Sequence, residues 1–354
     1  LYRNDGAQFT NVTQPTGVGD PRWGTSAAFL DYDNDGDLDL FVANYVAFSP
    51  DQNVYCARGN VHTYCDPDEF PAQADILYRN DGERYTDVTQ SMGLTHVGRG
   101  LGVTTSDYDG DGDIDLYVAN DGTMNFFYEN RGAFFSEVSL ETGTRFNGYG
   151  QAEAGMGVDW ADYDNDGDTD LYVTNFSAET NTLYQNNGGH FSDVTQPVGL
   201  DQPTYAPLGF GTHFFDYDND GFLDIFTANG HVLDRIYEID STQHHAQPSQ
   251  LLRNRLGERF YDVSDGVGVD FTAPHIGRGS ARGDYDNDGD VDLLIAVQQA
   301  PARLLRNDGD GAMNWLVIEL VGHRHPDAIG TRVFVEANGR RQLRERRSGG
   351  SYLS

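Results

Sequence analysis

The residues best suited to do chemistry are aspartates that recur at fixed spacing in five short segments. Each segment has carboxylates at positions 1, 3, 5 and 9 and glycine at position 6, and the segments begin at Asp31, Asp107, Asp162, Asp216 and Asp284. This spacing wraps oxygen ligands around a hard cation at about 2.3–2.6 Å, and the glycine permits a sharp turn. These five segments, called the acidic loops, therefore predict about five calcium ions.

Each acidic loop offers four carboxylates and one backbone carbonyl as ligands. The predicted carboxylate ligands are Asp31, Asp33, Asp35, Asp39, Asp107, Asp109, Asp111, Asp115, Asp162, Asp164, Asp166, Asp170, Asp216, Asp218, Asp220, Asp224, Asp284, Asp286, Asp288 and Asp292. The predicted carbonyl ligands, at position 7, are Asp37, Asp113, Asp168, Phe222 and Asp290. A residue that contributes only its carbonyl can carry any side chain, so phenylalanine is compatible with a site in the fourth loop.

These loops differ from EF-hands, because position 12 is Val42, Val118, Val173, Thr227 or Ile295 and never the bidentate glutamate. We expect the aspartate at position 9 to take that role. The alternative is an acidic turn that binds nothing, but closely packed carboxylates repel one another, and five near-copies favour a bound cation. Magnesium is disfavoured because it gives up its waters reluctantly. Full coordination by protein favours structural ions over catalytic ones.

The composition supports cations as partners and argues against nucleic acid. The chain has 56 acidic and 23 basic residues and a formal charge of −33, which excludes a general nucleic-acid binder. Five divalent ions would add +10 and bring this charge to −23. No apolar run approaches the roughly 20 residues of a membrane helix, so we expect no membrane insertion.

A second signature alternates with the acidic loops and predicts β-hairpins. It reads Leu-Tyr-Arg-Asn-Asp-Gly at residues 77–82 and returns near residues 1, 127, 183, 251 and 304. Its Asn-Asp-Gly and Asn-Asn-Gly turns tolerate the positive φ of a tight hairpin. The segments on either side of each acidic loop alternate with period two, as strands do. Each unit therefore reads as four strands, and the class is all-β.

The spacing of the units predicts a β-propeller over residues 1–310. The acidic loops begin 76, 55, 54 and 68 residues apart, a period typical of four-stranded blades arranged radially. We expect a ring of seven blades when complete, of which about five and a half are present, with the missing strands preceding Leu1 and following the last blade. A compact ring of five or six blades is the alternative.

Two cysteines lie in one irregular insertion and predict a disulfide. Cys56 and Cys65 are nine residues apart in a segment rich in Pro, Asn, Tyr and Asp. A loop closed by two cysteines suits an oxidising compartment, which predicts an extracellular, cell-surface or periplasmic location. Reduced surface thiols are the alternative, and zinc is less favoured because only His62 is a further soft ligand nearby.

The alternating signatures resemble the FG-GAP or VCBS repeats of integrin-α-like propellers. The whole chain is similar to the cartilage acidic protein-like family, in which a propeller precedes an ASPIC/UnbV domain, and residues 311–354 resemble the first part of that domain. The resemblance implies the propeller fold and the metal but no uniform activity. Its marks are Trp23-Gly24-Thr25-Ser26, Ala154-Gly155-Met156-Gly157-Val158-Asp159, Ala228-Asn229-Gly230-His231-Val232, Asn314-Trp315-Leu316 and Asp327-Ala328-Ile329-Gly330.

The segment from Asn314 onward is the one basic region, with seven arginines against four acids. We expect it to dock onto the acidic propeller; anchoring an acidic partner is the alternative.

Two long connections, at residues 45–75 and 230–250, predict a ligand face opposite the acidic loops. They carry aromatic residues beside acids and amides, which can stack on sugars or cap a peptide. The leading hypothesis is a calcium-binding extracellular module for recognition, adhesion or scaffolding, with a protein or glycan ligand. A carbohydrate-active enzyme of lyase or dehydratase type, using His231, His244, His245 or His275, is the second hypothesis. A structural subunit of a larger surface assembly is the third.

Overall fold

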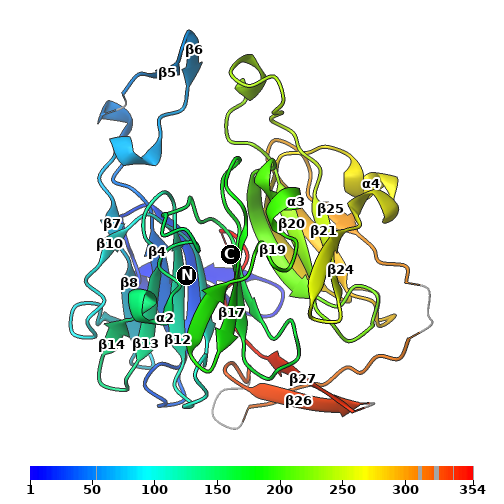
Figure 1. The fold of residues 1–354 in the computed structure, drawn as a ribbon. Helices are drawn as coiled ribbons and strands as arrows, with labels where there is room; N and C mark the ends of the chain where they lie inside the picture. Colours follow the sequence, from blue (N-terminus) through cyan, green and yellow to red (C-terminus); the bar gives the residue numbers. More distant parts are fainter. Residues whose placement is uncertain (53, 310–312, 323–326, 338, 354) are drawn as a thin grey trace.

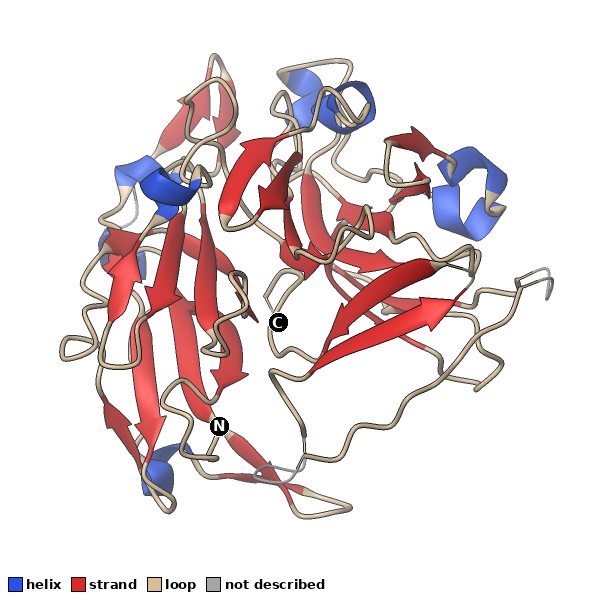
Figure 2. Cartoon of the chain, turned by 60° about the horizontal axis from the view of Figure 1, so that its bottom comes forward, coloured by secondary structure: helices blue, strands red, loops and turns tan. Residues whose placement is uncertain are grey.

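The computed structural model describes residues 1–354 except 53, 310–312, 323–326, 338 and 354. Antiparallel sheets arranged radially form five blades (Figures 1 and 2). Blade 1 contains β3 (Gly24–Leu30), β4 (Asp39–Asn44), β8 (Ile76–Asn80) and β9 (Tyr85–Asp87). Blade 2 contains β11 (Gly100–Ser106), β12 (Asp115–Asn120), β13 (Phe126–Asn130) and β14 (Phe135–Glu137). Blade 3 contains β15 (Val158–Ala161), β16 (Asp170–Val173), β17 (Thr182–Asn187) and β18 (His190–Asp193).

The remaining two blades differ in size. Blade 4 contains β19 (Gly209–Phe215), β20 (Asp224–Asn229), β21 (Gln250–Arg255) and β22 (Arg259–Asp262). Blade 5 has three strands, β23 (Gly277–Gly283), β24 (Asp292–Val297) and β25 (Arg303–Leu305). The all-β propeller is therefore confirmed, and the prediction of four strands per unit holds for four of these five blades. A complete ring of seven blades stays a prediction.

Separate two-stranded ribbons and short helices decorate the blades. The ribbons are β1 (Tyr2–Asn4) with β2 (Phe9–Asn11), β5 (Cys56–Arg58) with β6 (Val61–Thr63), β7 (Gln73–Ala74) with β10 (Val97–Gly98), and β26 (Arg332–Ala337) with β27 (Arg340–Glu345). The α-helices are α1 (Thr13–Thr16), α2 (Ser139–Thr142), α3 (Asp201–Tyr205) and α4 (Val269–Thr272). The 3₁₀ turns are η1 (Pro50–Gln52), η2 (Pro67–Glu69), η3 (Ile236–Glu238) and η4 (Ser264–Gly266).

The hydrophobic core is divided into layers, one between each pair of neighbouring blades. Between blades 2 and 3, for example, Tyr117, Phe127, Trp160 and Phe191 pack together in one buried cluster. A blade can bury its faces only against its neighbours, which explains why apolar residues occur on both faces of the inner strands.

Blade 5 lacks such cover on one face. Leu294 and Leu304 are 45% and 51% exposed there, whereas the equivalent Tyr117 and Phe127 of blade 2 are fully buried. The last described blade therefore has a neighbour on one side only.

The two faces of the propeller carry different features. Each acidic loop joins the first strand of a blade to the second, and position 9 is the first residue of β4, β12, β16, β20 and β24. The β26–β27 hairpin lies on this acidic-loop face, while the β5–β6 ribbon projects from the opposite end (Figure 1). The predicted segregation of acidic loops and long connections is therefore confirmed.

The predicted domain boundary at residues 310 and 311 lies outside the described residues. Residues 313–322 form no strand, and a polar hairpin, β26–β27, follows them. A separate C-terminal domain over 311–354 stays a prediction.

Candidate metal centres and the opposite face

Each acidic loop brings three carboxylates together. The side-chain oxygens of positions 1, 3 and 9 lie within 4.8 Å of one another in all five loops. The groups are Asp31, Asp33 and Asp39; Asp107, Asp109 and Asp115; Asp162, Asp164 and Asp170; Asp216, Asp218 and Asp224; Asp284, Asp286 and Asp292. The predicted convergence is thus present for these three positions.

The position-5 aspartates are not among these groups. Asp35 accepts the main-chain N–H of Asp37 at 2.9 Å, and Asp166 accepts that of Asp168 at 2.9 Å. The same bond recurs in the other three loops. Position 5 therefore fixes the turn that presents the position-7 carbonyl, and its service as a metal ligand stays a prediction.

Two positions in each loop adopt left-handed backbone conformations. Glycine at position 6 has φ between +88° and +100°, as expected for the sharp turn. Position 4 is also left-handed, with φ of 59° at Asn34, 62° at Asn165 and 76° at Gly110. Asparagine and glycine are the residues that tolerate this region, so their presence at position 4 in every loop was a signal that the sequence analysis missed.

The position-4 asparagines also link neighbouring loops. The side-chain amide of Asn34 donates to Asp113 at 2.7 Å, and that of Asn219 donates to Asp290 at 2.7 Å. Both acceptors stand at position 7 of the next acidic loop. The side-chain amide of Asn165 donates in the same way to the Gly221 carbonyl of the fourth loop, at 3.2 Å. Position 4 therefore links loop one to loop two, and loops three, four and five to one another, whereas Gly110 of the second loop has no side chain to make such a bond.

The position-9 aspartates are buried, which makes an empty site costly. Asp170 is fully buried and accepts main-chain N–H groups from Asn186 at 2.9 Å and Tyr163 at 3.1 Å. Burial raises the pKa of Asp39 to about 7 and that of Asp224 to about 8. Because desolvation opposes the charged carboxylate, a bound cation would reverse this penalty.

The donor set matches a hard cation. Every side-chain ligand in the three-carboxylate groups is an oxygen, which suits calcium and not zinc. Oδ1 of Asp107 is buried without a hydrogen-bond partner among the described residues, as a metal-facing oxygen would be. These residues therefore fit a calcium ion.

The hairpin signature is tied to the acidic loops by its asparagine. In every blade the main-chain N–H of this residue donates to the position-9 aspartate, at 2.7–2.9 Å. In four blades its side-chain amide also donates to the position-2 tyrosine carbonyl of the preceding blade. These pairs are Asn130 to Tyr32, Asn186 to Tyr108, Asn254 to Tyr163 and Asn307 to Tyr217.

The fourth loop has a second source of positive charge. Arg253 pairs with Asp218 at 2.6 Å, so a guanidinium already lies beside a candidate ligand there. Phe222, at position 7, is 6% exposed and lies 4.0 Å below the guanidinium of Arg340. Phe222, which replaces the aspartate found at position 7 of the other four loops, is therefore covered by Arg340 of the β26–β27 hairpin.

The basic hairpin docks onto the acidic-loop face, as the sequence predicted. Arg332 approaches Asp107 at 3.8 Å, and Arg340 donates to the carbonyl of Asp220 at 2.8 Å. Glu345 accepts from the Ser106 hydroxyl at 2.7 Å and from the N–H of Asp107 at 3.2 Å. Arg332 also donates to the Gly167 carbonyl at 3.3 Å, so the hairpin contacts the acidic loops of blades 2, 3 and 4.

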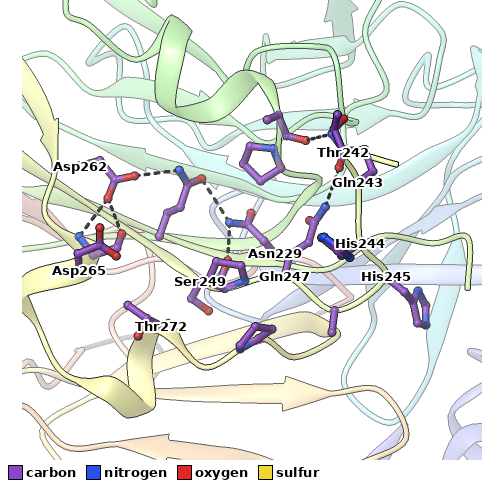
Figure 3. Close-up of a pocket in the computed structure, with 17 residues that line it drawn as sticks. Asn229, Thr242, Gln243, His244, His245, Gln247, Ser249, Asp262, Asp265 and Thr272 are labelled. Atoms are coloured by element: carbon purple, nitrogen blue, oxygen red, sulfur yellow. Dashed lines mark hydrogen bonds between the residues drawn. The ribbon is translucent and has the colours of Figure 1, made fainter. Parts of the chain in front are cut away.

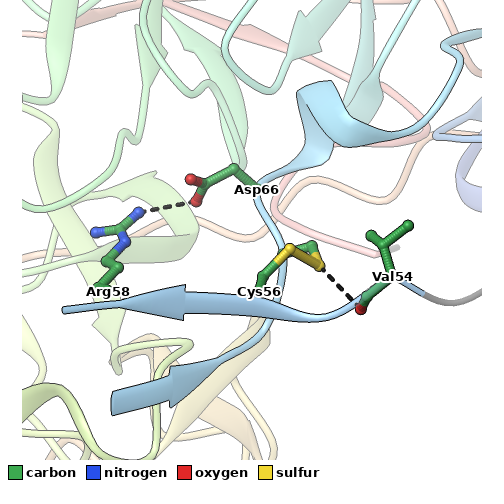
Figure 4. The surroundings of a disulfide bond; sticks show 5 residues. Val54, Cys56, Arg58 and Asp66 are labelled. Atoms are coloured by element: carbon green, nitrogen blue, oxygen red, sulfur yellow. Dashed lines mark hydrogen bonds and ion pairs between the residues drawn. A yellow bond between two sulfur atoms is a disulfide. The ribbon is translucent and has the colours of Figure 1, made fainter. Parts of the chain in front are cut away.

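On the opposite face, the first long connection is held by the predicted disulfide. Cys56 and Cys65 are bonded across the base of the β5–β6 ribbon, and Arg58 pairs with Asp66 at 2.8 Å (Figure 4). The ring of Tyr55 stacks on His62 with centroids 4.8 Å apart. The disulfide therefore closes a short hairpin whose stacked aromatic rings face solvent.

A cavity of about 490 Å³ lies where the long connections meet the propeller axis. We call it the mouth cavity. Tyr64 enters it from the first connection, Asp234 and His245 from the second, and Arg278 from the inner strand of blade 5. Arg278 lies 4.1 Å above the ring of Phe210 and donates to the Gly230 carbonyl at 2.9 Å, so its position is fixed.

A second, larger cavity of about 990 Å³ lies beside the connection between β20 and β21. Asp262 and Asp265 lie at one end and His244 and His245 at the other (Figure 3). Its amides are largely satisfied within the protein: Gln247 donates to Gln243 at 3.2 Å and accepts from the Leu208 N–H at 3.0 Å.

The four histidines considered for catalysis do not converge. His231 is fully buried; its Nδ1 accepts the Leu233 N–H at 3.0 Å, and its Nε2 contacts the Ser177 hydroxyl at 3.2 Å. His275 contacts Ser249 instead, at 3.1 Å. Among the described residues, every group of three or more potential metal-binding side chains is one of the aspartate groups. The described histidines therefore form no metal-binding group of this kind, and their use in an enzyme stays a hypothesis.

The described part of the chain contains no helix with the length and apolar composition needed to cross a membrane.

Comparison with known proteins identifies the repeats. The model of the FG-GAP-like repeat matches residues 1–42, 107–173 and 162–227. Human cartilage acidic protein 1 is 24% identical over 306 residues, which cover 83% of this chain and 41% of the human protein. The Xenopus tropicalis protein of the same name is 24% identical, with 62% of this chain and 32% of that protein covered. The chain therefore spans about a third to two fifths of the length of these relatives.

A solved structure with a similar course is a lectin from Agrocybe aegerita, described as recognising non-reducing terminal N-acetylglucosamine. It shares 16% sequence identity and a TM-score of 0.42, over 87% of this chain and 74% of the lectin. The chain is thus a β-propeller of FG-GAP-like repeats related to cartilage acidic protein 1.

Proposed function

We propose that this protein is a calcium-stabilised extracellular recognition module. The observation that carries the proposal is that the two faces of the propeller differ. Five groups of three aspartates lie on one face, and the long connections around the mouth cavity lie on the other. Calcium at the first face would hold strands and blades together. The second face would be left free to bind a glycan or protein, at the cell surface, in the extracellular medium or in the periplasm.

Calcium would be held by positions 1, 3 and 9 of each acidic loop, with the position-7 carbonyl as a further ligand. The position-9 aspartate accepts one N–H group from the third strand of its blade and one from the position-2 tyrosine of its own loop, so a cation bound there would stabilise the contact between the loop and that strand. The hairpin asparagine also donates to the preceding blade, so the cation would stabilise the contact between the two blades as well. This arrangement favours a structural role for the ions.

Ligand recognition is proposed for the mouth cavity because its residues combine aromatic faces with polar groups. Tyr64 is 68% exposed and lines the cavity beside Arg278 and Gln298. Aromatic rings stack on the apolar faces of sugars while amides and charged groups bond hydroxyls. The nearly balanced charge of Arg278 and Asp234 suits a neutral saccharide or an uncharged peptide stretch better than a polyanion.

The proposal is tested by binding of the calcium-loaded protein to glycan and peptide arrays. We expect a ligand whose affinity falls at least tenfold in Tyr64→Ala. The control is Tyr149→Ala, because Tyr149 is 80% exposed and does not line the cavity. Equal loss in both variants, or binding unaffected by Tyr64→Ala, would exclude the mouth cavity as the recognition site.

A further inference from the structure

The segment Arg347–Leu353 runs along the axis of the propeller, between the inner strands of the blades. We call it the axial segment. Its polar atoms meet first the strands of blades 1 and 2: the Phe29 N–H donates to the Ser348 hydroxyl at 3.0 Å, and the Thr105 hydroxyl donates to the Ser348 carbonyl at 3.1 Å. The end of the chain trace lies inside the ring in both views (Figures 1 and 2).

The next residues pair with blade 3 and reach blade 5. Ser351 and Val158 exchange two main-chain hydrogen bonds, at 2.7 and 3.0 Å. The Ser351 hydroxyl accepts the N–H of Ser280, on the inner strand of blade 5, at 3.2 Å. Since Phe29 belongs to blade 1, the axial segment joins the first and last described blades through the centre of the ring.

Charge and aromatic contacts anchor the two ends of the axial segment. Arg347 pairs with the buried Asp159 at 3.2 Å. Although burial alone would raise the pKa of Asp159, Arg282 and Arg347 hold it below its ordinary value. At the other end, the ring of Tyr352 packs against Phe210 of blade 4 with centroids 4.7 Å apart. All five blades therefore contact the segment.

The fit requires residues without side chains. Gly349 has φ of +79°, and a Cβ atom there would lie 2.9 Å from the Val103 carbonyl oxygen and 3.0 Å from the Ala28 methyl group. Gly350 has φ of +104° and donates its N–H to the Val103 carbonyl at 2.8 Å. The Ser-Gly-Gly-Ser sequence is thus complementary to the channel in both shape and backbone conformation.

We propose that the axial channel is a peptide-binding site for a segment of serine and glycine followed by an aromatic residue, with left-handed backbone conformations at Gly349, Gly350 and Ser351. Its occupant is the axial segment of the same chain, which serves as a cross-brace among the five blades and closes the channel beneath the mouth cavity. The contacts of the axial segment require no bound metal and no external ligand, although Tyr352 and Leu353 also line the mouth cavity.

The test compares Gly349→Ala with Gly339→Ala in the full chain. Gly339 has a nearly identical φ of +78°, but a Cβ atom there meets nothing within 4 Å, so backbone strain is matched and only the channel contact differs. We expect Gly349→Ala alone to lower the melting temperature, to speed hydrogen exchange of the Val158 amide at least tenfold, and to expose the Arg347–Ser348 bond to trypsin.

A synthetic peptide of residues 347–353 carrying a fluorophore tests the site directly. It should bind saturably to Gly349→Ala and at least tenfold more weakly to the wild type, whose channel is filled. Identical melting, exchange and proteolysis of the two glycine variants would overturn the proposal. If Gly349→Ala does not fold, Tyr352→Ala replaces it, because this change removes the Phe210 contact without backbone strain; unchanged Val158 exchange in that variant would likewise overturn the proposal.

Discussion

The side-chain amide of Asn254 donates to the main-chain oxygen of Tyr163 in the neighbouring blade, at 2.8 Å. Asn254 belongs to the hairpin of blade 4, and Tyr163 is position 2 of the acidic loop of blade 3. The same amide also donates to Leu223 of its own blade at 3.0 Å. One buried asparagine therefore joins a hairpin, the acidic loop beside it and the next blade, which explains why the two sequence signatures alternate.

Loss of this bond should weaken the contact between blades. Asn254→Ala leaves a buried carbonyl of Tyr163 without its donor, which costs about 1–3 kcal/mol. Asn80→Ala is the matched control, because the Asn80 amide donates to Leu38 of its own blade at 3.1 Å and, among the described residues, does not reach a tyrosine carbonyl of another blade. Thermal unfolding at saturating calcium should show the larger decrease for Asn254→Ala. Equal decreases would show that the link between blades contributes nothing measurable.

Removal of one position-9 carboxylate should remove one calcium ion. Asp39 is buried at the centre of the first group, whereas Asp37 is exposed and is proposed to contribute only its carbonyl. We expect Asp39→Asn to lower the bound calcium by one ion per chain and Asp37→Asn to leave it unchanged, as measured by equilibrium dialysis and elemental analysis. An unchanged calcium content in Asp39→Asn would contradict the assignment of position 9.

Protonation of His231 should destabilise the fold at acidic pH. Burial lowers the pKa of His231 to about 4, so its neutral form is favoured in the folded state. Relative to an ordinary value near 6.5, its contribution is fully present above that pH and is lost as pH falls towards 4. Asparagine at this position can still accept the Leu233 N–H.

The check is the melting temperature between pH 6.5 and 4.5, at saturating calcium. The decrease should be smaller in His231→Asn than in the wild type. Burial also raises the pKa of Glu153 to about 7, which has the opposite effect in this range, so the difference between variant and wild type is the relevant quantity. Parallel pH profiles would show that His231 is not held neutral by the fold.

The disulfide should protect the first long connection without supporting the blades. Cys56 and Cys65 close a short loop that lies outside the five blade sheets. Replacing both with serine should speed tryptic cleavage after Arg58, which is partly exposed, while the main unfolding transition shifts little. A large decrease in the main transition would instead place this connection within the cooperative core.

Much of this architecture could be predicted from local sequence patterns. The aspartates at positions 1, 3 and 9 and the strand after them were evident because the repeat places them at fixed spacing. The left-handed residue at position 4 was equally readable and was missed. The partners of the hairpin asparagines and of the axial segment were not readable. Phe29 and Ser348, for example, are 319 residues apart, and nothing in either local sequence indicates the other.

The four histidines show a different limit of sequence reasoning. Their chemistry suggested catalysis, but the fold buries His231 and turns His275 towards Ser249. Burial and direction depend on contacts between distant segments, so residue type alone could not predict them, and catalysis by these histidines stays a hypothesis.

The dependence of the melting temperature on calcium tests the central claim most directly. Each site adds about 2.7 kcal/mol of stability when free calcium is 100 times its dissociation constant. The account predicts that excess chelator lowers the melting temperature by more than about 10 °C, that calcium restores it, and that magnesium at the same concentration does not. A melting curve that is unchanged in excess chelator would contradict the account.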